Sequence, residues 1–143
     1  MILIIDTNSV IAALPKDSAS RKIILSCKFK FFSLKILHEE IDRYQDEIIQ
    51  RTNMTPSQFF YLKERIASCI AIVADEKVVS FMEEARHVMD MIDPKDTPFI
   101  ALALAVENDG IWPEDRHFEQ QSRVKVWKTK ELLLWLEGTS LED

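Results

Sequence analysis

The sequence predicts an α/β fold of three layers, α/β/α, in which helices cover both faces of a central, mostly parallel sheet. Short apolar strand patterns alternate with helical patterns along the whole chain, which is typical of a parallel sheet with crossover helices. The first strand, Met1 to Ile5, is continuously apolar, as expected of a strand buried on both faces. Two glycines in 143 residues disfavour all-β folds and glycine-rich nucleotide loops.

The length and composition predict one domain. A chain of 143 residues with 47% hydrophobic residues can bury a sizeable core without disulfides or metal staples. The sequence has no internal repeat, low-complexity segment or linker. We therefore expect a single domain over residues 1–137 and a frayed C-terminal tail over residues 138–143.

The pattern places the strands and helices in the following order. Strands are expected at residues 1–5, 30–34, 69–74, 111–112 and 124–127. Helices are expected at residues 8–14, 18–27, 37–51, 56–68, 76–91, 97–108 and 130–137. Thr55 followed by Pro56 predicts a helix start with a threonine cap and proline in the first turn. Thr97 and Pro98 repeat that signal, and Gly110 is expected to close the helix that they open.

Charge, cysteines and the N-terminus bear on location and partners. A net charge of −6 disfavours nucleic-acid binding unless bound cations reverse the local field. Cys27 and Cys69 show neither metal-type nor redox-type spacing, which favours a reducing compartment. The sequence has no signal peptide pattern and no membrane-length apolar run, so we expect a cytoplasmic protein.

Acidic residues follow the predicted strands or open the helices after them. Asp6 comes directly after the first strand, Asp96 precedes the helix that Thr97 opens, and Asp115 lies in the loop after the strand at 111–112. In an open parallel sheet, sites form beyond the carboxyl ends of the strands. Each residue alone also fits a helix cap or a solvated turn, and Asp93 fits an ordinary turn residue.

Helical geometry separates the neighbouring residues Glu39 and Glu40. Glu40 falls about 70° from the centre of the helix's apolar stripe, which consists of Leu37, Ile41, Tyr44 and Ile48. Glu39 falls nearly opposite the stripe, in solvent. Glu40 is therefore the residue able to face a site, although both also fit solvated helix charges.

Carboxylates gathered at one sheet edge repel one another and raise one another's pKa, so the cluster favours a cation among the oxygens. Carboxylate and water ligands suit Mg²⁺ or Mn²⁺. The chain has no Cys/His set of the kind that binds zinc, and His38, His87 and His117 are widely spaced.

Four segments resemble the PIN domain family, including the VapC-like toxin ribonucleases. They are DTN at 6–8, HEEI at 38–41, DPKDTPFIALALA at 93–105 and IWPEDRHF at 111–118. The resemblance covers nearly the whole chain and implies a metal-dependent endoribonuclease. It implies that the family's four acidic positions are Asp6, Glu40, Asp96 and Asp115, which would hold Mg²⁺ or Mn²⁺, with Asn8 as a polar neighbour.

The resemblance also implies substrate and partners. RNA would be the substrate, and Lys95, Arg116 and His117 lie beside the acidic positions, where they can contact phosphates. A toxin of this kind would pair with an antitoxin protein, and similar proteins often form homodimers. No membrane partner is expected.

One position departs from the family pattern. Pro113 stands where similar proteins often have Thr or Ser, two residues before the last Asp, and Glu114 is a candidate extra ligand there. An alternative is therefore a PIN fold that binds RNA or protein without cutting. Phosphotransfer receivers and haloacid-type phosphohydrolases fit less well, since the second acidic residue that each needs near Asp6 is missing and Asn8 stands at the haloacid position.

Overall fold

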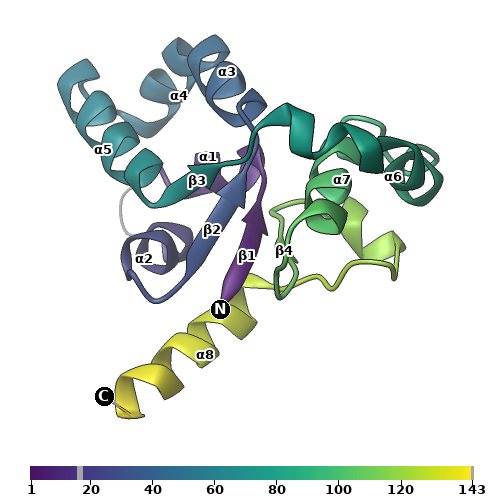
Figure 1. Cartoon of the computed structure of the whole chain (residues 1–143). Helices are drawn as coiled ribbons and strands as arrows, with labels where there is room; N and C mark the ends of the chain where they lie inside the picture. The colour runs from purple at the N-terminus through teal and green to yellow at the C-terminus, as the bar shows by residue number, and fades with distance from the viewer. Residues whose placement is uncertain (16–17, 143) are drawn as a thin grey trace.

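A computed structural model describes residues 1–15 and 18–142, and in these residues the chain forms a four-stranded parallel sheet (Figure 1). The strand order is β3-β2-β1-β4. The strands are β1 (Ile2–Ile5), β2 (Lys30–Ser33), β3 (Ile70–Ile72) and β4 (Ile111–Trp112). The predicted α/β class with a parallel sheet is confirmed.

Helices occupy both faces of the sheet (Figure 1). The α-helices are α1 (Thr7–Ala12), α2 (Ala19–Leu25), α3 (Ile36–Arg43), α4 (Gln45–Thr52), α5 (Pro56–Ser68), α6 (Met82–Met89), α7 (Thr97–Ala105) and α8 (Thr129–Glu142). The 3₁₀ turns are η1 (Asp75–Lys77), η2 (Val79–Phe81) and η3 (Arg116–Gln120).

The side chains of β1 alternate between two hydrophobic clusters, one on each face of the sheet. Leu3 and Ile5 pack in a cluster with residues of α1, α2, α3, α4, α5 and α8. Ile4 points the other way, into a cluster with residues of α6 and α7. All three side chains are completely buried. This alternation is what a strand sandwiched between two helical layers requires, and it gives the three predicted layers.

The helix expected at 37–51 is divided in two. Its first part, α3, ends at Arg43, and α4 begins at Gln45. Tyr44 between them has φ −100° and ψ 12°, outside helical geometry. Leu37, Ile41 and Ile48 are buried, as the apolar stripe predicted, but Tyr44, the fourth residue of that stripe, is 44% exposed.

The segment expected as one helix over 76–91 is helical only from Met82 to Met89. Residues 75–81 form the two 3₁₀ turns η1 and η2 instead. Val79, in η2, is 67% exposed, whereas Ala85 and Met89 of α6 are completely buried. Apolar spacing alone does not distinguish a 3₁₀ start from an α-helical one.

Gly110 does not close a helix, which corrects the sequence-based expectation. Helix α7 ends at Ala105, and Gly110 directly precedes β4 with φ +136°. A Cβ atom there would lie 2.6 Å from the Lys125 carbonyl oxygen and 2.9 Å from the Trp127 ring. Glycine is required here by close backbone approach rather than by a helix end.

The C-terminal part differs in extent from its prediction. The strand expected at 124–127 contributes an isolated parallel bridge between Ile111 and Val126. Helix α8 continues through residues 138–142, which were expected to form part of a frayed tail. Within the described residues, no helix has both the length and the apolar character needed to cross a bilayer.

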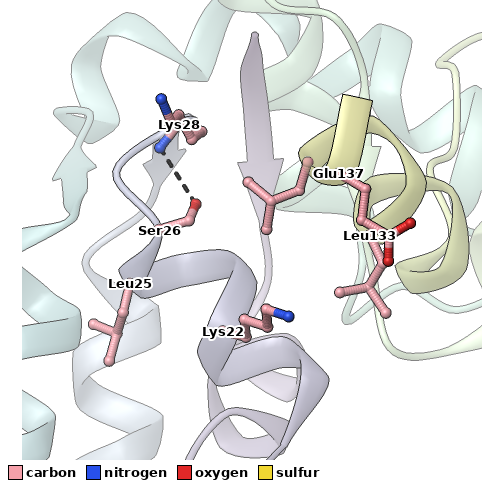
Figure 2. A pocket seen from close by; sticks show the side chains of 7 residues that line it. Lys22, Leu25, Ser26, Lys28, Leu133 and Glu137 are labelled. Carbon is pink, nitrogen blue, oxygen red and sulfur yellow. Dashed lines mark hydrogen bonds between the residues drawn. The ribbon is translucent and has the colours of Figure 1, made fainter. Parts of the chain in front are cut away.

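A groove of about 760 Å³ lies between α2 and α8 (Figure 2). Figure 2 shows Leu25 and Lys22 of α2 on one side and Leu133 and Glu137 of α8 on the other. Glu137 is the one carboxylate among its lining residues. This groove therefore lacks the acidic cluster that the sequence places beyond the strand ends.

Candidate metal centre

The order of the strands reverses beside β1, and two acidic residues lie at that point. The chain runs from β1 outward to β2 and β3, and then returns to place β4 on the other side of β1. Ile5 pairs with Trp112, so Asp6 and the loop that carries Asp115 leave the sheet side by side. Such a switch point at the carboxyl ends of parallel strands is where open α/β sheets form their sites.

Asp6 is a buried carboxylate that caps α1. Its Oδ1 accepts a hydrogen bond from the Ser9 backbone N–H at 3.0 Å, and the residue is 2% exposed. Burial raises the pKa of Asp6 from 3.8 to about 6, against the lowering effect of the Ser9 hydrogen bonds. The negative charges of Asp96 and Asp115 add to the rise, so both lie within electrostatic reach of Asp6.

Glu40 joins this edge through the residue after Asp6. The Thr7 hydroxyl donates to Glu40 Oε1 at 3.1 Å, which connects α1 to α3. Thr7 is buried, Glu40 is partly buried and Glu39 is exposed. The two neighbouring glutamates thus lie on different sides of α3, as their predicted positions relative to the apolar stripe require.

Asp96 occupies the N-cap position of α7 without capping it by its side chain. Thr97, predicted as the cap, is instead the first residue of the helix, and its hydroxyl donates to Asp90 Oδ1 at 2.6 Å. The Asp96 carboxylate is therefore left for another partner. Its Oδ2 is buried and accepts no hydrogen bond.

Asp93 both makes a turn and faces the site. Its Oδ1 accepts from the Lys95 backbone N–H at 3.0 Å, which is the turn predicted for it. Its Oδ2 lies 3.2 Å from Nδ1 of His117. Asp93, Asp96 and His117 each offer one ligand atom, and these three atoms lie within 4.8 Å of one another.

His117 Nδ1 lies among three carboxylates. The distances from Nδ1 are 3.2 Å to Asp93 Oδ2, 3.4 Å to Asp96 Oδ2 and 3.3 Å to Asp115 Oδ2. Nδ1 is buried and, like Asp96 Oδ2, has no hydrogen-bond partner of suitable geometry. A polar nitrogen and oxygen left buried and unpaired are costly, and in native proteins such atoms often mark a missing ion or water.

The same crowding perturbs Asp96. Its pKa is raised from 3.8 to about 6, chiefly by burial and next by the negative charge of Asp93. Contact with His117 opposes the rise, and the charge of Asp115 adds to it. The carboxylates of this site therefore lack a full complement of positive charge among the protein's own groups.

The remaining predicted residues lie around this cluster. Asn8, Lys95 and Arg116 are exposed, next in sequence or nearly so to Asp6, Asp96 and Asp115. Pro113 is buried beside the end of β4. Glu114 is exposed, and partial burial of its carboxyl raises its pKa.

The sequence pattern indicates no metal-site role for Asp93 or His117. The three histidines are spread widely along the chain, and the position of Asp93 is explained by an ordinary turn. The available signal was local: His117 lies two residues after Asp115, and Asp93 lies three residues before Asp96. Both therefore lie within three residues of an acidic position that the sequence already indicates.

The fold and the site together define a class: an α/β domain with an acidic cluster, able to hold a metal ion, at the switch point of a parallel sheet. A family model described as PIN domain matches residues 4–137. The chain belongs to the PIN domain family, which confirms the resemblance seen in its motifs. No curated protein and no solved structure matches the chain significantly.

Proposed function

We propose that this protein is an endoribonuclease that hydrolyses RNA phosphodiester bonds with Mg²⁺ or Mn²⁺ held by Asp6, Glu40, Asp96 and Asp115. The observation that carries the proposal is the convergence of carboxylates around the unpaired atoms Asp96 Oδ2 and His117 Nδ1. PIN domains are generally nucleases, and membership in the family gives this cluster its expected chemistry.

The residues present fit a divalent cation. Asp6 is 2% exposed and Asp96 Oδ2 is buried, and both carboxyls have pKa values raised to about 6. Burial is the main cause of these raised values and repulsion between the carboxylates adds to it, so a bound cation would favour the charged forms. Carboxylate oxygens are the ligands that Mg²⁺ and Mn²⁺ prefer. The buried unpaired oxygen of Asp96 has the character of a direct ligand.

The four proposed ligands differ in how they bind the ion. Asp6 and Asp96 are the direct ligands, and Glu40 and Asp115 bind the ion directly or through water. Thr7 orients Glu40, and the Ser9 N–H orients Asp6. When bound, the ion lowers the pKa of a water molecule and stabilises negative charge on the phosphate.

The net charge of −6 disfavours RNA binding. Basic side chains beside the site would nevertheless supply contacts to the phosphates. A groove of about 320 Å³ is lined by the cations Arg116 and Lys128 and by the carboxylates Glu114, Asp115 and Glu119. Lys128 Nζ lies 3.6 Å from Glu119 in an exposed pair, so it can exchange that partner for a phosphate. Lys95 adds a third exposed cation next to Asp96.

The biological setting proposed is a cytoplasmic toxin of a toxin–antitoxin pair. An antitoxin would cover the acidic cleft, and an arginine from it can pair bidentately with the carboxylates. A homodimer is compatible with exposed aromatic residues on α5, where Phe60 is 45% and Tyr61 66% exposed. Both partners are proposals drawn from the family resemblance.

The test is cleavage of a fluorescent single-stranded RNA by purified protein with Mn²⁺ or Mg²⁺. The comparison is an Asp6→Asn, Asp96→Asn double variant, together with an EDTA control. We expect cleavage by the natural protein that requires the ion and disappears in the double variant. Cleavage that survives the double variant would contradict the assignment of the site.

The second candidate function is a PIN fold that binds RNA or protein without cutting. The observation that favours it is Pro113, which is buried and has no hydroxyl to support Asp115. Binding of the RNA without cleavage, under conditions where the ion binds, would favour this candidate. Replacing Pro113 by Thr should then raise cleavage, whereas in an active nuclease this change should have little effect.

A further inference from the structure

We propose that His117 binds the same divalent ion as Asp93 and Asp96 through its Nδ1, and that this nitrogen ligand makes the site prefer Mn²⁺ to Mg²⁺. The inference rests on the proposed function for the presence of the ion. It adds two ligands, Asp93 and His117, to the four acidic positions, and it predicts which metal the site selects.

The backbone holds the imidazole in place. Asp115 Oδ1 accepts from the His117 backbone N–H at 3.0 Å and begins the turn η3. The next side chain, Phe118, is completely buried in the cluster with α6 and α7. Because the backbone N–H of His117 bonds to Asp115 and the following side chain, Phe118, is anchored in the core, the fold constrains the position of the His117 side chain.

The spacing of the donor atoms fits ligation. Nδ1 lies 3.2 Å from Asp93 Oδ2 and 3.4 Å from Asp96 Oδ2. Two donors bound at about 2.1–2.2 Å to one ion lie about 3.0 Å apart at octahedral angles and about 3.5 Å apart at tetrahedral angles. The observed distances fall between these values.

Hydrogen bonding accounts for the arrangement less well. An imidazole Nδ1–H directs one hydrogen at one acceptor, yet Nδ1 has three carboxylate oxygens at similar distances and a suitable angle to none of them. The rival arrangement is an imidazolium that serves as the counter-ion of the carboxylates and leaves when a metal binds. The two arrangements predict opposite effects of removing the ring nitrogen.

A nitrogen ligand changes the metal preference. Imidazole is a good ligand for first-row transition ions, whereas Mg²⁺ binds oxygen and gives up its waters reluctantly. Carboxylates accept either ion. A mixed set of one nitrogen and several oxygens therefore favours Mn²⁺ over Mg²⁺.

The first test is the electron spin echo modulation spectrum of Mn²⁺ bound to the natural protein, which needs no variant. We expect modulation from a directly bound ¹⁴N nucleus. Bound Mn²⁺ without nitrogen modulation would overturn the inference and leave the proposed nuclease function standing. Nitrogen modulation in a protein that does not cleave RNA would support the inference and contradict the proposed function.

The second test is calorimetric titration of both ions into the natural protein, into His117→Phe and into the control His87→Phe, whose histidine is exposed on α6. We expect His117→Phe to weaken Mn²⁺ binding by about tenfold or more and Mg²⁺ binding by less than about threefold. The control should change neither. The inference would be overturned if His117→Phe weakened the binding of both ions equally. It would also be overturned if both ions bound more tightly, as the counter-ion arrangement predicts.

Discussion

The hydroxyl of Thr7 donates a hydrogen bond to Oε1 of Glu40 at 3.1 Å, across 33 positions of sequence. Thr7 follows Asp6, the buried carboxylate at the end of β1, so the bond places a carboxylate of α3 beside the first acidic position. In the sequence, Thr7 is visible only as the middle residue of the DTN segment. Its position in the structure makes it the residue that orients a ligand from another element.

We predict that Thr7→Val weakens binding of Mn²⁺ by about tenfold while it changes stability little. Valine keeps the branched shape of the side chain in its buried position but removes the donor to Glu40. Calorimetry measures the metal affinity, and thermal unfolding measures the stability. Thr7→Ser keeps the hydroxyl and should retain most of the affinity; equal loss in Ser and Val would show that the methyl group, not the hydrogen bond, is what matters.

We predict that Asp6→Asn stabilises the metal-free protein at neutral pH, by about 1–3 kcal/mol in the free energy of unfolding. Burial holds the pKa of Asp6 in the folded protein at about 6, above its ordinary value of 3.8. The stability linked to its proton is therefore fully present below about pH 4 and is lost as the pH rises through about 6. Asparagine keeps the oxygen that accepts from Ser9 N–H and carries no charge.

The measurement is urea unfolding of both proteins in EDTA between pH 4 and pH 8. The stabilising effect of Asp6→Asn should grow with pH over this range and be smallest at pH 4. With added Mn²⁺ at pH 7.5, the natural protein should be more stable than Asp6→Asn, because the natural carboxylate then binds the ion. A difference that does not vary with pH would contradict the buried, charge-strained state of Asp6.

We predict that Ser33→Ala lowers the free energy of unfolding by about 1–3 kcal/mol. Ser33 is completely buried, and its hydroxyl donates to the Ile5 carbonyl at 2.7 Å, directly before Asp6. Alanine leaves a buried polar group without that partner. Denaturant unfolding tests this against Ser122→Ala, an exposed site whose substitution should be close to neutral.

We predict that Gly110→Ala destabilises the protein by more than about 2 kcal/mol, since it combines a strained backbone with a clash. The added Cβ would lie 2.6 Å from a backbone oxygen, and the φ of +136° is unfavourable for alanine. Gly138→Ala is the matched control. Nothing lies within 4 Å of a Cβ at Gly138 in helix α8, so alanine there should be neutral or stabilising by up to about 1 kcal/mol.

The sequence pattern alone predicts the three layers and the main strands of the sheet. The run from Ile2 to Ile5 has no polar residue because both of its faces are covered, and that is visible without a structure. Thr55 and Pro56 start α5 with the predicted cap, reinforced by Gln58 in a capping box. These signals depend on residues that are close in sequence, so packing against distant segments does not change them.

Other features depend on contacts that the sequence does not display. Tyr44 interrupts a helix whose apolar stripe continues on both sides of it, so periodicity gave no sign of the break. Gly110 resembled a helix end, but its role is set by Lys125 and Trp127 farther along the chain. The requirement for glycine at position 110 therefore comes from packing between segments that are distant in sequence.

The acidic site likewise contains residues that the sequence predicts and residues that it does not. Asp6, Asp96 and Asp115 could be predicted to meet because parallel strands bring their carboxyl ends to one edge. The approach of His117 to three of the site's carboxylates depends on the turn η3 and on the anchoring of Phe118. A single histidine in a loop carries no periodic signal, so only the three-dimensional arrangement brings it to the site.

The most direct test of the account is an anomalous difference map from crystals of the protein grown with Mn²⁺. We predict a peak at the carboxyl edge of the sheet, within bonding distance of Asp96 Oδ2 and His117 Nδ1 and close to Asp6. Such a peak would show that the acidic cluster is a divalent-metal site. Saturating Mn²⁺ with no peak between these residues would contradict the central claim.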